Sequence, residues 1–199
     1  SEDMTGEFGF CGYFKEFDHD LAEDDRLQYA RGERPPAFDP EAQPKPPAAE
    51  WDEARLAKAN RNYAVEFVRN GVMALTRTLG RERAVELGMQ TGRLTGLHQY
   101  THLAAAVGAV DGDAQDAGRF LAAMFQGMGD GAELSGSAGA VTIRQSGLRI
   151  VRGLEGDDRA DLLRCWTEVW KGTVASHRAF MNVEVAESGD GLVWTIRDE

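Results

Sequence analysis

The sequence predicts an α+β protein, in which a helical N-terminal half packs on a small antiparallel sheet made of two hairpins. An extended proline-rich arm precedes this domain. Hydrophobic residues recur at helical spacing over much of residues 51–128, and two later segments alternate apolar and polar residues around glycine-containing turns. A further predicted helix separates the hairpins, and this order of elements is typical of α+β folds.

Residues 1–50 are predicted to form the extended arm, and residues 51–199 a single α+β domain. The arm holds all six prolines of the chain, between Pro35 and Pro47. Prolines favour extended backbone and interrupt helices. Five aromatic residues of the arm would form an unusual apolar patch in water, so we expect them to pack on the body or on another subunit. They are Phe8, Phe10, Tyr13, Phe14 and Phe17.

Three helices are predicted in the first part of the domain. The first begins near Trp51 and ends at Leu79, before Gly80 as a C-cap. The second runs from about Arg81 to Val107, and the third begins after Asp113, a favourable N-cap residue. Glycines then break the helical pattern. In the first helix the apolar residues three, four or seven apart are Leu56, Tyr63, Phe67, Ala74 and Leu75.

Two hairpins and a fourth helix complete the predicted domain. The fourth helix spans roughly Asp157 to His177 and separates the hairpins. The turns are Gln145-Ser146-Gly147 and Ser188-Gly189-Asp190-Gly191. The predicted strands are, in chain order, residues 140–144, 148–152, 181–185 and 192–196.

Composition limits the partners that we expect. The net charge is −11 and no run of Lys or Arg is present, so we expect neither nucleic acid nor an anionic membrane as a partner. No apolar segment approaches the roughly 20 residues that span a bilayer, and the first residues do not resemble a signal peptide. Cys11 and Cys165 lack metal-type spacing and are expected to be free thiols, which favours a cytoplasmic protein.

His98 and His102 are the candidate catalytic or metal-binding pair. Residues four apart in a helix point the same way, so two imidazoles can share a divalent metal such as zinc or exchange protons with a substrate. Both fall near Leu87 and Leu94 around the helix, which predicts a half-buried position. A hydrogen-bonded pair that supports the core is the alternative. A catalytic zinc would need a third protein ligand, and Gln99 stands where the glutamate of a HExxH motif would lie.

Gly88, Gly92 and Gly96 form a stripe along the same helix. Each glycine costs up to about 1 kcal/mol relative to alanine in a helix interior. The stripe therefore indicates a close approach, either of another helix or of a ligand.

Cys165 is the candidate nucleophile, although its place among apolar residues also predicts an inert, buried thiol with a raised pKa. His177 follows twelve residues later, which is about 18 Å along one helix, so it cannot serve as the base within that helix. A base for Cys165 would have to come from another element, such as the helix of His98 and His102.

Several segments resemble a known family. They are Thr78-Leu79-Gly80-Arg81-Glu82-Arg83-Ala84, the glycine-rich approach to Val141–Val151, Leu162-Leu163-Arg164-Cys165-Trp166, and the closing hairpin from Val183 to Asp190. In these segments, residues from about 55 to 199 resemble the L-2-amino-thiazoline-4-carboxylate hydrolase family, which is similar to four-vinyl-reductase-type ligand-binding domains. The resemblance implies the fold and a ring-opening hydrolase activity. Of the cysteines usual in that family, Cys165 alone is present.

Two functions remain open on the sequence. The first is a hydrolase-like enzyme that acts on a small polar or heterocyclic substrate at a non-peptide C–N bond. His98 and His102 would be its acid/base residues or metal ligands, and Cys165 its nucleophile. The alternative is a non-catalytic small-ligand-binding domain or an accessory subunit of a larger enzyme complex. With either function we expect a small-molecule substrate or ligand, and a homo- or hetero-oligomer assembled through the N-terminal arm.

Overall fold

The computed structural model describes residues 17–22, 25, 41, 52–109, 112–137, 139–178 and 180–199. Residues Asp52–Glu199 form one compact unit. The predicted arm lies almost entirely outside the described residues, and so do Cys11 and four of the five aromatic residues of the arm. The expected extended form of the arm and its role in assembly therefore stay predictions.

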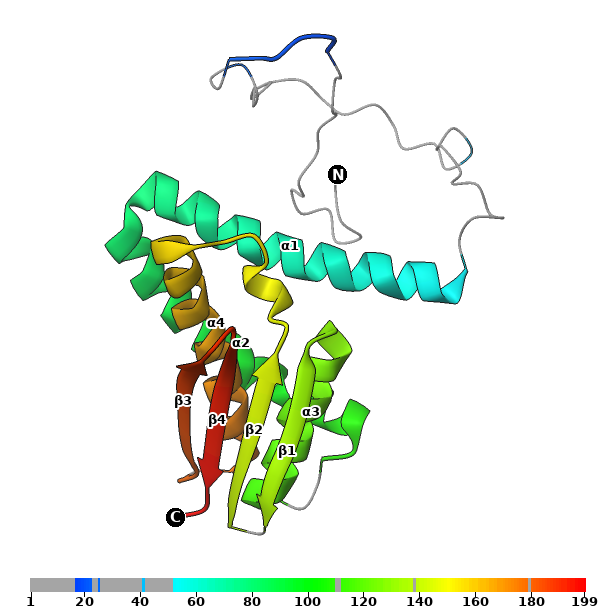
Figure 1. Cartoon of the computed structure of the whole chain (residues 1–199), viewed down its shortest axis with the longest axis vertical. Helices are drawn as coiled ribbons and strands as arrows, with labels where there is room; N and C mark the ends of the chain where they lie inside the picture. Colours follow the sequence, from blue (N-terminus) through cyan, green and yellow to red (C-terminus); the bar gives the residue numbers. More distant parts are fainter. Residues whose placement is uncertain are drawn as a thin grey trace. The chain divides into compact units, whose positions relative to one another are not determined.

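The described residues form four α-helices: α1 (Glu53–Leu79), α2 (Arg81–Val107), α3 (Ala114–Met128) and α4 (Gly156–His177), as Figure 1 shows. Aspartates cap two of them. The Asp52 carboxylate accepts a hydrogen bond from the Arg55 amide at the start of α1, and Asp113 accepts one from the Asp116 amide at the start of α3. The predicted helices are confirmed to within two residues at each predicted end, because capping and apolar periodicity agree in this part of the chain.

One antiparallel sheet holds the four strands of the described residues, in the order β1-β2-β4-β3. The strands are β1 (Gly131–Ser137), β2 (Ala140–Ser146), β3 (Asn182–Ser188) and β4 (Gly191–Arg197). Ile143 of β2 and Trp194 of β4 are register partners, and both are fully buried. The helices α2, α3 and α4 lie on one side of the sheet (Figure 1). The predicted α+β class and the predicted second hairpin are confirmed.

The first hairpin differs from its prediction. We expected strands at 140–144 and 148–152, but β2 pairs with β1, and Arg149–Val151 forms a short 3-10 helix, η3. Gly139, with a φ of 91°, lies in the turn between β1 and β2, whereas Gly136, with a φ of 116°, lies within β1 and pairs with Val141 of β2. The glycines of this segment predict a break in the helical pattern and give no signal for the strand within it. Ile150 and Val151 are buried in η3, and the apolar residues of a buried short helix resemble those of a buried strand in sequence.

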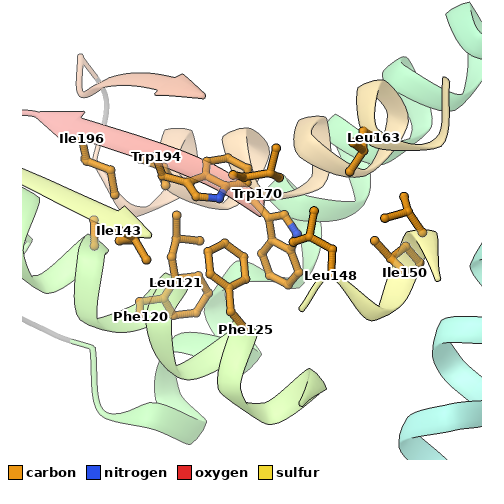
Figure 2. Close-up of a cluster of buried hydrophobic side chains, with 14 of the residues drawn as sticks. Phe120, Leu121, Phe125, Ile143, Leu148, Ile150, Leu163, Trp170, Trp194 and Ile196 are labelled. Carbon is orange, nitrogen blue, oxygen red and sulfur yellow. The ribbon is translucent and has the colours of Figure 1, made fainter. Parts of the chain in front are cut away.

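Aromatic residues from three elements meet in the core (Figure 2). The ring of Phe125 on α3 lies 5.4 Å from that of Trp170 on α4 and 5.5 Å from that of Trp194 on β4. A buried polar chain continues from this cluster. The Trp194 indole N–H donates to Gln145 Oε1 at 2.9 Å, and the Gln145 amide donates to Asp130 Oδ2 at 2.8 Å. Every polar atom of this chain is thereby paired inside the core.

Membrane insertion was not expected from the sequence. Within the described part of the chain, the helices do not combine the length and the apolar character that crossing a bilayer requires.

Candidate functional site

His98 and His102 lie on the exposed side of α2, so the prediction that they are half-buried is wrong. Leu94, on the same side, is 65% exposed. The packed side of α2 is instead the one that carries the buried Gly92 and Gly96. A face made of glycines contributes little to a hydrophobic pattern, and the leucines therefore indicated the wrong side. The role of the two imidazoles as acid/base residues or metal ligands stays a prediction.

The glycine stripe of α2 is a helix–helix contact. A Cβ atom at Gly92 would lie 2.7 Å from the carbonyl oxygen of Cys165, and one at Gly96 would overlap the carbonyl oxygen of Val169. Gly172 of α4 lies against the carbonyl of Arg93 in the same way. The two backbones approach so closely that only glycine fits. Close helix packing is confirmed, and α4 occupies the stripe that a ligand would need.

Cys165 is buried within this contact between α2 and α4. The residue is 4% exposed, and its Sγ lies 3.8 Å from the carbonyl oxygen of Val85. Burial, assisted by the charge of Asp161, raises the pKa of the Cys165 thiol to about 11. The thiol is therefore neutral at physiological pH, and a neutral thiol is a poor nucleophile. The predicted burial and raised pKa are confirmed.

A buried polar chain across α2, α3 and α4 escaped sequence reasoning. The Tyr100 hydroxyl lies 2.5 Å from His177 Nδ1, and His177 Nε2 lies 3.6 Å from Asp116 Oδ2. The side chains of His177 and Asp116 are 1% and 4% exposed. Burial, together with the Asp116 charge, raises the pKa of Tyr100. The phenol is within hydrogen-bond distance of the imidazole, whereas the distance from the imidazole to the Asp116 carboxylate is too long for a hydrogen bond, and the imidazole is closed to solvent. Because the three residues lie on three helices, no local spacing could have indicated the chain.

A shallow hollow of about 90 Å³ lies between α1 and η3. Its lining residues are Asn62, Val65, Glu66, Arg69, Arg149 and Arg152. Arg149 donates to Asn62 Oδ1 at 2.6 Å, and Arg69 donates to the carbonyl oxygen of Arg152 at 2.8 Å. Outside the lining of the hollow, the Arg61 Nε lies against Gly129 and is buried without a hydrogen-bond partner. Guanidinium groups bind carboxylates and phosphates, so this hollow has the chemistry of a small anion site, with Glu66 offsetting part of its charge.

Exposed aromatic side chains lie along α1. We define the outer face of α1 as Leu56, Asn60, Tyr63, Phe67, Asn70 and Ala74, all of which are exposed. Tyr63 and Phe67 are 73% and 69% exposed, and their rings stack 6.4 Å apart. Val65 and Met73, on the opposite side of the helix, are buried. Contiguous exposed apolar side chains mark interaction surfaces in soluble proteins.

The chain matches no protein-family model and no curated protein. In the part of the chain that the structure describes, no three His, Cys, Asp or Glu side chains are placed to hold a metal ion together. The resemblance to the thiazoline-carboxylate hydrolases and the zinc hypothesis therefore stay predictions.

Proposed function

We propose that this domain is a non-catalytic accessory subunit and that the outer face of α1 is its assembly surface. One observation carries the proposal: Tyr63 and Phe67 stack on each other in solvent, within a helix face that holds no charged residue between Leu56 and Ala74. In a chain with 28% charged residues, a solvated helix face is expected to be charged. A partner that covers the two rings removes apolar area from water.

The placement of the hydrolase candidates also favours an accessory role. His98 and His102 lie on the exposed side of α2, whereas Cys165 lies beneath the opposite, glycine-lined side. The body of the helix separates the thiol from both imidazoles, so one substrate cannot contact all three groups at once. A hydrolase that used them together would require α2 and α4 to separate.

The test compares the native mass of three forms of the full chain, each isolated under native conditions from the cells that normally make it. The forms are the wild type, Phe67→Lys and the control Leu94→Lys, which places the same charge on an exposed leucine of α2. We expect the wild type and the control to exceed the 21.8 kDa of one chain, and Phe67→Lys to fall to that mass. An unchanged assembly in Phe67→Lys, or a wild type of 21.8 kDa, would contradict the proposal.

A second candidate function is the binding of a small anion in the hollow between α1 and η3. The guanidinium groups of Arg69, Arg149 and Arg152, which line the hollow, support it. Titration calorimetry with inorganic phosphate and with citrate tests it. We expect Arg152→Ala to weaken binding about tenfold or more, the effect of losing one charge-assisted contact. Absence of binding by the wild-type protein would exclude this function.

A further inference from the structure

We propose that the partner on the outer face of α1 is a second copy of this chain, with the two α1 helices antiparallel about a twofold axis at the level of Val65. This inference rests on the proposed assembly surface and adds the identity and the register of the partner.

The spacing of the outer face is that of a coiled coil. From Leu56 to Ala74 its six residues are separated alternately by four and three positions. This period of 3.5 residues keeps one face of a helix against a partner helix. Asn60, Phe67 and Ala74 occupy the a positions, and Leu56, Tyr63 and Asn70 occupy the d positions.

The same residues are arranged symmetrically about Val65. Tyr63 and Phe67 lie two positions from it, Asn60 and Asn70 five positions, and Leu56 and Ala74 nine positions. A twofold interface requires that residue i of one copy meets residue j of the other, and that j meets i. Antiparallel pairing at this level therefore places aromatic against aromatic, amide against amide and aliphatic against aliphatic. Each layer joins an a residue to a d residue, as antiparallel helices require.

Charged residues at the two ends extend this symmetry. Glu53 and Arg77 both lie twelve positions from Val65, and both are exposed. They are the next a and d residues of the pattern, so pairing places each carboxylate beside the guanidinium of the other copy. A parallel pair would instead set Glu53 against Glu53 and Arg77 against Arg77. The charges therefore favour the antiparallel arrangement, and a polar amide layer helps to fix its register.

Two further features make the contact feasible. Ala57, Ala64 and Gly71 run along one edge of the outer face at intervals of seven, and such small residues let helices approach closely. The buried residues Val65 and Met73 place the body on the other side of α1, so the two bodies lie on opposite sides of the helix pair. The layers from Leu56 to Ala74 carry no charge, and Glu66, which flanks the central layer in both copies, is paired with Arg69 of its own chain.

The contact is of ordinary size for a dimer. Each covered aromatic side chain buries about 150–250 Å². The four central rings, already partly covered in the single chain, would thus contribute roughly a third of the 1,200–2,000 Å² typical of specific interfaces. The remaining layers along this helix supply further area, since α1 is about 40 Å long.

Mass and disulfide cross-linking of the purified full chain test the inference. We expect light scattering to give twice 21.8 kDa at micromolar concentration. In a Cys11→Ser background, we expect the double variant N60C/N70C to form a covalent dimer on oxidation, because residue 60 of one copy meets residue 70 of the other. The single variants N60C and N70C should not cross-link, since each cysteine would lie about 15 Å from its copy, beyond the reach of a disulfide. Circular dichroism confirms that each variant keeps its helices.

Three outcomes would overturn the inference, and they are separable from failure of the proposed function. A purified chain of 21.8 kDa, combined with a larger native assembly that Phe67→Lys disrupts, would show that another protein covers the face. Cross-linking of N60C alone would show a parallel pair. A dimer that survives Phe67→Lys would place its interface elsewhere, and would remove the assembly surface as well.

Discussion

Gln145 joins two buried polar groups, the Trp194 indole and the Asp130 carboxylate. Its amide accepts from the Trp194 indole and donates to Asp130, and it is 2% exposed. We predict that Gln145→Met, which keeps the volume, lowers the free energy of unfolding by about 2–4 kcal/mol, because it leaves a donor and a carboxylate oxygen unpaired. Urea denaturation measures the loss, with the exposed Gln99→Met as control. A loss below that of the control would show that water replaces the amide.

Cys165 makes stability depend on pH in the alkaline range. Its folded-state pKa of about 11 lies above the ordinary value of 9.0, so the unfolded chain ionises first as the pH rises. The stability that the neutral, buried thiol contributes is complete below pH 9 and is lost as the pH rises through 11. We predict a loss of about 1 kcal/mol between pH 8 and pH 10 that Cys165→Ala does not show. If the free energy of unfolding falls with pH at the same slope in the wild type and in Cys165→Ala, the raised pKa of the buried thiol is contradicted.

The candidate site was only partly predictable at the scale of residues. The apolar neighbours of Cys165 correctly indicated burial, because Trp166 and Trp170 are adjacent on one helix. His98 and His102 were placed on the wrong side, because glycines rather than leucines form the packed face of α2. The chain of Tyr100, His177 and Asp116 depends on tertiary contacts between distant positions, so the sequence contains no local signal for it.

At the scale of elements, the contact between α2 and α4 depends on glycine. We predict that Gly96→Ala lowers the free energy of unfolding by about 3 kcal/mol or more, since the new methyl group overlaps a backbone carbonyl that cannot rotate away. Gly127→Ala on α3 is the matched control, because its Cβ would meet nothing within 4 Å. The control should gain up to about 1 kcal/mol from helix propensity. Thermal unfolding of both variants checks the pair, and similar melting temperatures would mean that α2 and α4 can move apart.

Helix ends were predictable because capping chemistry is local. Asp113 and Gly80 mark ends of helices through their own side chain or backbone. The strand β1 was not predictable in the same way. Its residues, Gly-Ala-Glu-Leu-Ser-Gly-Ser, lack β-branched side chains, and only pairing with β2 makes them a strand. The apolar repeat of α1 predicted a helix correctly, but it could not show that all five of its residues, from Leu56 to Leu75, face outward.

At the scale of the whole molecule, the two faces of α1 separate folding from assembly. Val65 and Met73 hold the helix to the body, whereas Tyr63 and Phe67 lie on the other side. Substitutions on the outer face therefore leave the core intact. We expect them to change the association of the chain with little change in its unfolding, a combination that a core residue cannot give.

Opposite charges placed at positions 63 and 67 of two different variants can restore the dimer. Phe67→Lys and Tyr63→Glu should each be monomeric, because each places two unpaired charges against aromatic rings. In a mixture of the two proteins, Lys at position 67 of one copy meets Glu at position 63 of the other, and the intact Tyr63 meets the intact Phe67. We therefore predict a heterodimer of one chain of each kind, with an affinity at least tenfold above that of either homodimer.

Native mass spectrometry distinguishes the species when one variant carries a mass label. A mixture that stays monomeric while the wild type dimerises would exclude the antiparallel register, since no parallel arrangement sets position 63 against position 67.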